Sequence, residues 1–330
     1  MPTLKDVAKA SGVSLTQASR ALNDYDDVSE QTKQKVRKAA TGIGYVKNVN
    51  ASRLALQSNN QISVVIYAFA SSKHSEDNIL IRMLNGIYGF AEEIGYDILP
   101  LFVSIKRPKS YLDYCKSRMI PGIIFIGARY DDAYFNELMD SDYPCVTIDT
   151  PARGRNKASV VIDDEKYSQA AVSEMIKRGY RRIGMINGHE YASVSIRRLQ
   201  GYKSALLQNG LPFDESIVMD GGFMRDMAAG EARKLLGAKV DAIFCASDIM
   251  AIGALEAVQS EGYNVPGDVG LFGFDGLLLT SFVKPNISTV VQDNYQKGYE
   301  AAKLLHSILQ GKHYEPRKFI ECELRIADSI

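Results

Sequence analysis

Residues 3–23 read TLKDVAKASGVSLTQASRALN, and this stretch decides the fold at the N-terminal end of the chain. Thr3 and Asp6 have the spacing of a capping box, in which each residue satisfies a backbone N–H at the start of a helix. We therefore expect a first helix over residues 3–11. Gly12 follows it and is expected to end it, since glycine readily adopts the left-handed conformation found after helices.

A second helix is expected almost immediately after the first. Ser14 and Gln17 form another capping box only two residues beyond Gly12, which predicts a helix over residues 14–23. Two short helices joined by a tight turn have the spacing of a helix-turn-helix motif. Residues 29–41 predict a third helix, which completes a small helical head. On it we expect four basic side chains on the wetter sides: Lys33, Lys35, Arg37 and Lys38.

The face that the second helix turns outward favours a nucleic-acid partner. Small polar groups and one arginine in the N-terminal part of a helix can reach base edges in the major groove. The backbone N–H groups at its start can meanwhile face phosphate. A purely structural three-helix bundle is the alternative. The outward positions are expected to be Leu15, Thr16, Ser19 and Arg20, with Ala18, Ala21 and Leu22 nearer the core.

The charge of the chain is unevenly distributed. The 330 residues carry 39 basic and 39 acidic side chains, a net charge of zero. Residues 1–60 alone carry nine Lys and Arg against five Asp and Glu, a net charge of +4 that the rest of the chain balances with −4. A small basic head on a larger acidic body predicts that only the head meets a polyanion.

The segment after the head is expected to act as a linker, with two turns of helix in residues 48–56. A helix of that length is marginal in water, because nucleation is costly, and it would form only against a partner. Leu54 and Leu56 are then apolar residues on an exposed segment. We expect a domain division of 1–46 for the head, 47–61 for the linker and 62–330 for the body.

The body shows strands and helices in alternation. Nearly continuous apolar strands between amphipathic helices predict parallel sheets covered on both faces, and nine strands favour two doubly wound lobes, an α/β fold. The strands are expected at 62–69, 97–103, 122–127, 145–149, 160–163, 182–187, 241–246, 269–275 and 289–292. The helices are expected near 79–94, 165–178, 197–209, 226–236, 248–262 and 295–310.

The chemistry-bearing residues argue against an enzyme. The sequence has no phosphate-binding glycine motif, no metalloprotease motif and no nucleophile elbow. Its four cysteines and four histidines lack metal-ligand spacing, so neither a metal nor a cofactor is expected. No apolar stretch is long enough to cross a membrane, and the N-terminus does not have the pattern of a secretory signal. We expect a cytoplasmic protein.

Polar residues at strand ends predict a ligand cleft. Asp149, Ser247 and Asp275 each follow an apolar strand, where ligands of open α/β sheets bind. Together with an arginine and aromatic rings they suit a polyhydroxylated ligand, since carboxylate and guanidinium groups engage hydroxyls in pairs. Asp248 is expected to cap the next helix rather than touch ligand. Asp275 precedes no strong helix that it could cap, so we expect it to contact the ligand. Phe274 could instead be a buried residue of the hydrophobic core.

The residues also carry a resemblance to a known family. The motifs in the head and in the body resemble the signature of the lactose/galactose-repressor family of bacterial transcriptional regulators, over essentially the whole chain. In the head they are residues 3–14, 18–23, Val28-Ser29, Thr32, Gly44-Tyr45, Asn48 and Ala51 with Leu54. In the body they are residues 198–202, Ala246-Ser247-Asp248, Met250-Ala251, Gly253 and Gly273-Phe274-Asp275.

The resemblance implies a role for each matching position. Base contacts would come from Leu15, Thr16 and Arg20, and phosphate contacts from Thr3, Ser14, Gln17 and Asn23. The linker would form a hinge helix with Leu54 as a minor-groove wedge. The effector cleft would be lined by Asn78, Ile79, Asp149, Arg198, Ser247, Phe274 and Asp275. The lobes would consist of residues 62–160 with 292–320 and residues 161–291 with 321–330, with the chain crossing near 160–163, 288–293 and 319–322.

Two positions depart from the family pattern. Lys47 stands where the family usually has Pro, and Gln17-Ala18 replaces the more usual Thr-Val. These changes bear on the hinge and on the operator bases. We expect a homodimeric repressor that binds a near-palindromic operator in double-stranded DNA and responds to a mono- or oligosaccharide. No tail-built tetramer is expected. A solute-binding protein for transport shares the two-lobed body, but the basic head and the missing signal disfavour it.

Overall fold

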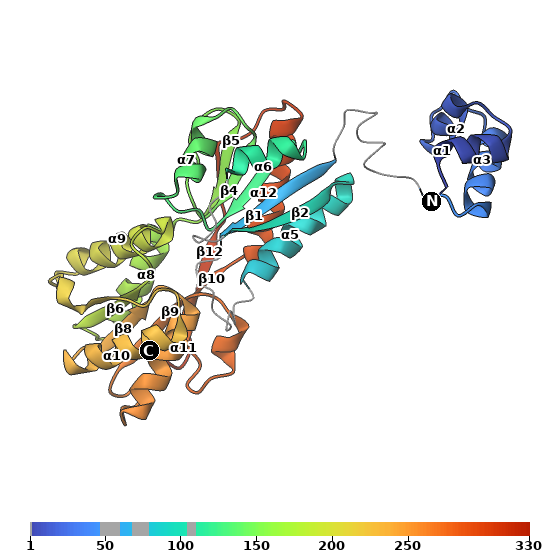
Figure 1. Cartoon of the computed structure of the whole chain (residues 1–330). Helices are drawn as coiled ribbons and strands as arrows, with labels where there is room; N and C mark the ends of the chain where they lie inside the picture. The colour runs from blue at the N-terminus through green and yellow to red at the C-terminus, as the bar shows by residue number, and fades with distance from the viewer. Residues whose placement is uncertain (1, 47–59, 68–78, 104–109) are drawn as a thin grey trace. The chain divides into compact units, whose positions relative to one another are not determined.

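The computed structural model describes residues 2–46, 60–67, 79–103 and 110–330. The chain divides into two compact units, Met1–Asn59 and Asn60–Ile330. The unit with the three helices is called the head and the larger unit the body (Figure 1). None of the helices in the described ranges is both long and apolar enough to span a lipid bilayer. The predicted hinge helix, including Leu54, lies outside the described residues.

The head consists of α1 (Leu4–Ser11), α2 (Leu15–Leu22) and α3 (Glu30–Gly42). The first capping box is confirmed, since the Asp6 carboxylate accepts a hydrogen bond from the backbone N–H of Thr3 at 2.8 Å. Gly12 ends α1 with a φ of 64°, which a residue with a Cβ adopts only under strain. Only half of the second capping box forms in the described head. The Ser14 hydroxyl accepts from the backbone N–H of Gln17 at 3.1 Å, but the Gln17 side chain does not bond back to Ser14.

The three helices of the head pack around a small apolar core. Ala18 and Ala21 on α2 are fully buried against Val7 and Val36, as the sequence predicted for the two alanines. The expectation for Lys33 was wrong, because only 6% of it is exposed. Its ammonium group lies 2.8 Å from the Glu30 carboxylate, so its charge stays paired while its aliphatic stem covers the core.

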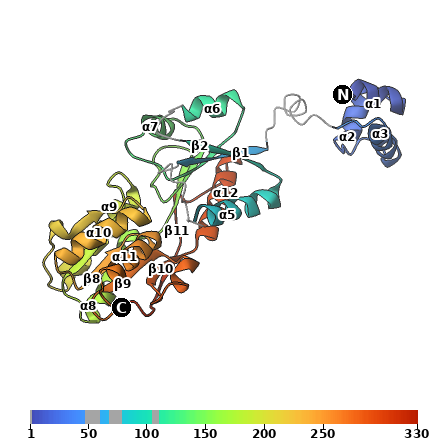
Figure 2. The ribbon, with the colours of Figure 1, turned by 60° about the horizontal axis from the view of Figure 1, so that its bottom comes forward.

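The body contains two six-stranded sheets. The first has the order β11-β5-β4-β3-β1-β2 and is entirely parallel. Its strands are β1 (Gln61–Tyr67), β2 (Asp97–Val103), β3 (Ile123–Ile126), β4 (Cys145–Ile148), β5 (Lys157–Val161) and β11 (Arg317–Phe319). Helices α5 (Ile79–Ile94) and α12 (Asn294–Leu309) cover one face, while α6 (Tyr111–Ser117) and α7 (Ala133–Asp140) cover the other. Figure 2 shows α5 and α12 side by side.

The second sheet has the order β12-β10-β9-β8-β6-β7, and only its β10–β12 pair is antiparallel. Its strands are β6 (Ile183–Asn187), β7 (Val218–Asp220), β8 (Ala242–Cys245), β9 (Gly270–Asp275), β10 (Ser288–Gln292) and β12 (Cys322–Arg325). It is covered by α8 (Asp164–Lys177) with α9 (Ser193–Gln208), and by α10 (Arg225–Gly237) with α11 (Asp248–Ser260) (Figure 1). Two short 3₁₀ turns are η1 (Glu215–Ile217) and η2 (Leu278–Ser281).

The chain passes between the two sheets at three places in the described body: after β5, after β10 and between β11 and β12. We call the parts around the first and second sheets lobe 1 and lobe 2. The strand predicted at 160–163 lies too far along the chain, since β5 occupies 157–161 and so begins three residues earlier and ends two residues earlier. The sequence did not predict five short elements: α6, α7, β7, β11 and β12.

Candidate functional site

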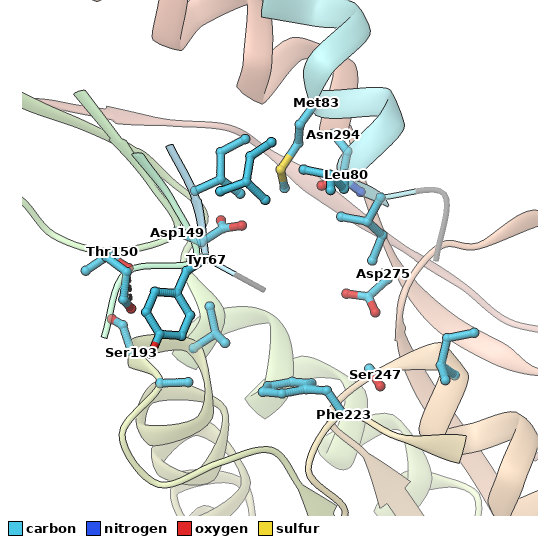
Figure 3. Close-up of a pocket in the computed structure, with 18 of the residues that line it drawn as sticks. Tyr67, Leu80, Met83, Asp149, Thr150, Ser193, Phe223, Ser247, Asp275 and Asn294 are labelled. Carbon is cyan, nitrogen blue, oxygen red and sulfur yellow. Dashed lines mark hydrogen bonds between the residues drawn. The ribbon is translucent and has the colours of Figure 1, made fainter. Parts of the chain in front are cut away.

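A cavity of about 620 Å³ lies between the two lobes of the body. Its walls are built at the carboxyl ends of β1, β3 and β4 in lobe 1 and of β8 and β9 in lobe 2, where open α/β sheets bind ligands. That volume is in the range of small-molecule sites. In Figure 3, Leu80, Met83 and Asn294 lie on one side of the cavity, and Phe223 and Ser247 lie across from them.

Most of the wall is apolar, with a few polar groups at defined points. Lobe 1 supplies Ile66, Tyr67, Ile79, Leu80, Met83, Phe102, Ile126, Gly127, Ala128, Asp149 and Thr150, and lobe 2 with the crossing segments supplies the rest. The predicted cleft residues Ile79, Asp149, Arg198, Ser247 and Asp275 all belong to the wall. Asn78 lies outside the described residues. Further wall residues were not predicted from the sequence, among them Tyr67, Met83, Phe223, Gln292 and Asn294.

A buried polar chain joins the two lobes beneath the cavity. Lys297 on α12 is fully buried, and its ammonium group donates to Asp149 of lobe 1 at 2.6 Å and to the side-chain oxygen of Gln292. Gln292 in turn donates to an oxygen of the Asp275 carboxylate of lobe 2 at 2.7 Å. A cation sealed from water requires such acceptors, so these four residues hold one another in place.

Arg198 extends this polar chain within lobe 2. It is only 4% exposed, and its Nε donates to the Asp164 carboxylate at 2.8 Å while Nη1 lies 3.8 Å from Asp275. Burial alone would lower the pKa of Arg198, but the two carboxylates outweigh burial and raise it. Phe274 was expected at the cavity wall and is not there. Its fully buried ring lies beneath the Arg198 guanidinium, 3.8 Å from its centroid.

The cap expected from Asp248 is wrong, while Asp275 lies in the cavity wall as predicted and also contacts the start of α11. Ser247, not Asp248, is the N-cap of α11. Asp248 is fully buried and fastens neighbouring strands, because its carboxylate accepts from Thr289 at 2.6 Å and from the backbone N–H of Leu277 at 2.7 Å. Burial raises its pKa to about 6. Asp275 does meet a helix start, since it accepts from the backbone N–H of Asp248 at 3.4 Å.

Three residues of the cavity wall have positive φ angles, which residues with a side chain rarely adopt. The φ angles are 61° for Asp149, 57° for Phe223 and 128° for Asp275. Such conformations persist where surrounding structure enforces them, and they gather at ligand sites. The hydrogen bonds from Lys297 to Asp149 and from Gln292 to Asp275 hold these two carboxylates in place and so help to maintain the unfavourable backbone conformations.

Asn294 provides an uncommitted polar group in the wall. It is 2% exposed, and its Oδ1 is sealed from water without a hydrogen-bond partner. A buried amide oxygen without a partner is costly, so it favours a ligand that brings a donor. Among the described residues, Lys297 donates to one oxygen of Asp149, and no hydrogen bond reaches the other. Both groups lie on the wall of the same cavity.

The lobes also touch beside the cavity. Tyr130 of lobe 1 donates from its hydroxyl to the Ser193 hydroxyl of lobe 2 at 3.2 Å, and the Arg129 guanidinium lies 3.6 Å from the ring centroid of Tyr191. Ser193 is part of the cavity wall. A ligand at this wall can therefore alter contacts that hold the lobes in their present arrangement.

The described residues contain no group of three acidic, His or Cys side chains placed to hold a metal ion.

The second candidate surface is the outward side of α2 in the head. Leu15, Thr16 and Gln17 are exposed there, with 43% of Leu15 accessible. Ser14 is committed to capping α2, and Asn23 donates to the backbone oxygen of Ser19 at 2.8 Å. Thr3 caps α1 and donates to Asp6 at 2.8 Å. Arg20 lies on the same helix and forms an ion pair with Asp27.

Two family models match the chain. Residues 3–48 match the one described as "Bacterial regulatory proteins, lacI family", and residues 172–330 match the one described as "Periplasmic binding protein-like domain". The first match covers the head, and the second covers most of lobe 2 together with α12 and β11 of lobe 1.

Curated relatives match over nearly the full length. The HTH-type transcriptional repressor CytR of Escherichia coli K12 is 32% identical, with 99% of this chain and 96% of the relative covered. Catabolite control protein A of Priestia megaterium is 30% identical over 92% and 91%. Among solved structures, a CelR–cellobiose complex is 28% identical with a TM-score of 0.74, over 100% of both chains. The lac repressor dimer bound to operator has the same fold, with 22% identity, a TM-score of 0.87 and coverage of 99% and 98%.

Proposed function

Because the chain belongs to the LacI family of bacterial regulatory proteins, we propose that it is a transcriptional repressor whose affinity for operator DNA is set by a small ligand bound between the two lobes. One observation carries this proposal: a single chain combines a helix-turn-helix head, with α2 presenting an outward polar face, and a cavity lined by both lobes of its body. Such a protein acts where the DNA is, in the cytoplasm, and has no catalytic role.

The head is proposed to dock α2 in the major groove. Leu15, Thr16 and Arg20 would contact bases, and the residues at the helix ends, Thr3, Ser14, Gln17 and Asn23, would contact phosphates. A helix of eight residues offers too few contacts for tight specific binding. Two heads on a near-palindromic operator supply enough, and Leu54 of the linker is proposed to wedge between base steps at the centre.

The body is proposed to hold the two heads together as a homodimer. Large apolar side chains are exposed on two of its elements: Ile81 and Tyr88 on α5, at 55% and 58%, and Leu278 with Phe282 around η2, at 67% and 71%. Ile81 and Tyr88 are seven residues apart and so share one face of their helix. Exposed apolar groups of this kind mark protein contacts, and a second copy of the chain buries them.

The ligand is proposed to be an uncharged, hydroxyl-rich molecule such as a mono- or oligosaccharide. Hydroxyls can donate to the Asn294 oxygen and to the second oxygen of Asp149, while the apolar wall covers C–H faces. The cations at or beneath the wall, Arg198, Arg225 and Lys297, already have carboxylate partners, so a phosphorylated or acidic ligand gains little from them. The CelR structure in the comparison carries cellobiose, a ligand of this chemical class.

The proposal is tested by selecting binding sites from random duplex DNA with the full-length protein. We expect enriched sites with dyad symmetry, and an affinity that falls steeply with salt as basic side chains displace counterions. Arg20→Ala should select sites that lack the base Arg20 contacts, whereas Arg155→Ala, in the exposed loop between β4 and β5 of the body, should select the same sites as wild type. Failure to enrich any sequence, or an affinity insensitive to salt, would contradict the proposed function.

A further inference from the structure

An acidic loop follows α2 in the head and holds the arginine of that helix. The Nε of Arg20 donates to one oxygen of the Asp27 carboxylate at 3.1 Å, and its Nη2 lies 2.5 Å from the other. The guanidinium also lies over the ring of Tyr25, 4.7 Å from its centroid. Two parallel contacts and a stacked ring fix both the plane and the direction of the guanidinium.

The loop that carries Asp27 is itself anchored. Asp24 accepts two hydrogen bonds from Arg37 of α3, both at 2.8 Å, and lies 3.4 Å from the ammonium group of Lys33. The backbone N–H of Tyr25 donates to the carbonyl of Arg20 at 3.2 Å. The loop therefore holds Asp27 in a defined place beside α2, so its ion pair with Arg20 is more than a transient surface contact.

The edge of the guanidinium that Asp27 uses decides what Arg20 can still bind. An arginine has five N–H donors, and the Nε and Nη2 edge is taken by the carboxylate. The end-on edge, formed by one Nη1 hydrogen and the second Nη2 hydrogen, keeps the spacing that matches the O6 and N7 acceptors of guanine. Holding one edge leaves the other oriented and ready for a planar, two-point contact.

We propose that Asp27 is a specificity-determining residue, which positions Arg20 so that it reads a guanine in each half of the operator. This inference rests on the proposed DNA binding and adds to it a residue that never needs to touch the DNA. Asp27 brings a negative charge close to phosphates, which weakens binding to any sequence. Its contribution is therefore to discrimination between bases rather than to affinity.

The test compares two loop variants of the full-length protein on DNA selected by the wild type. Asp27→Asn keeps the size of the side chain but removes the charge that fixes the guanidinium. Asp26→Asn is the matched control, since Asp26 has the same charge in the same loop and takes part in none of the ion pairs of the described head. Affinities are measured at one salt concentration for the selected site and for the three other base pairs at each half-site position.

We expect wild type to prefer guanine at one position per half-site, and Arg20→Ala to abolish that preference. Asp27→Asn should reduce it about tenfold, within the discrimination that one two-point contact provides. Its binding to unrelated sequence should equal or exceed that of wild type. Asp26→Asn should gain the same nonspecific binding and keep the full preference.

Two outcomes would overturn the inference. If Asp27→Asn retains the preference and simply binds the selected site more tightly, Asp27 is a counter-ion that Arg20 discards on DNA. If no position depends on Arg20, the arginine does not read a base. The second outcome also removes the base contact proposed for Arg20, but the proposed repressor function itself fails separately, if wild type selects no sequence at all. Equal thermal unfolding of the two loop variants shows that both heads fold.

Discussion

At the scale of single residues, Lys297 connects the cavity to the rest of the body. It is fully buried, and it bonds the Asp149 carboxylate of lobe 1 and Gln292 on the strand that leads out of lobe 2. The sequence could not reveal this role. A lysine in an amphipathic helix ordinarily lies on the solvated side, and only its tertiary neighbours show that this one does not. Asp149, at a strand end, could be predicted.

Replacing Lys297 should therefore destabilise the body. Lys297→Met leaves the Asp149 carboxylate and the Gln292 oxygen without their donor, and we expect a loss of ~2–3 kcal/mol in the free energy of unfolding. Asp149 keeps some contact with water, which holds the loss below that of a fully sealed charge. Urea unfolding of the full chain, followed by circular dichroism, measures the change.

Two further variants show whether the ion pair is responsible. Lys303→Met removes a lysine from the exposed side of the same helix and should cost less than about 0.5 kcal/mol. Asp149→Asn added to Lys297→Met should recover part of the loss, because no unpaired charge remains. A Lys297→Met protein as stable as Lys303→Met would contradict the role given to the pair.

At the scale of elements, the long apolar strands and amphipathic helices were predictable, and the short elements were not. β1 and β9 are continuous apolar runs that two covered faces require. β7 and β11 have three residues each, too few to show a period, and pairing with their neighbours forms them. The start of α9 at Ser193 was missed because its N-cap is Ala192, which gives no capping signal.

The start of α11 should make stability depend on pH. The ordinary pKa of an aspartate is 3.8, and burial raises that of Asp248 to about 6, so the folded protein binds this proton more tightly than the unfolded chain. The contribution of Asp248 to the free energy of unfolding therefore falls by up to ~3 kcal/mol as the pH rises from about 4 to about 6. Asp248→Asn should show a smaller decrease across this window in unfolding experiments.

The exposed Asp328 supplies the control for this comparison, because Asp328→Asn should follow the wild-type curve throughout. Burial also raises the pKa of Asp164, so some decrease persists in every variant. The difference between the two asparagine variants isolates Asp248. If their curves run parallel from pH 4 to pH 6, Asp248 binds its proton no more tightly in the folded protein than in the unfolded chain, and the raised pKa is wrong.

At the scale of the whole molecule, the sequence predicted the two-lobed body, and the structure adds how the lobes are joined. The Lys297 chain and the contacts of Arg129 and Tyr130 with lobe 2 both border the cavity. A ligand that favours one arrangement of the lobes shifts the population of the body toward it. The ligand acts on the operator only through this difference, and thermodynamic linkage makes the effect reciprocal.

The most direct test of the account measures that reciprocity. Cellobiose and D-glucose, each alongside its phosphorylated counterpart, are titrated into the full-length protein by calorimetry, and operator affinity is measured with and without each compound that binds. We predict that an uncharged compound binds more tightly than its phosphorylated counterpart and changes operator affinity about 5- to 150-fold. The operator should change the affinity for that compound by the same factor. A compound that occupies the cavity and leaves operator affinity unchanged would contradict the central claim.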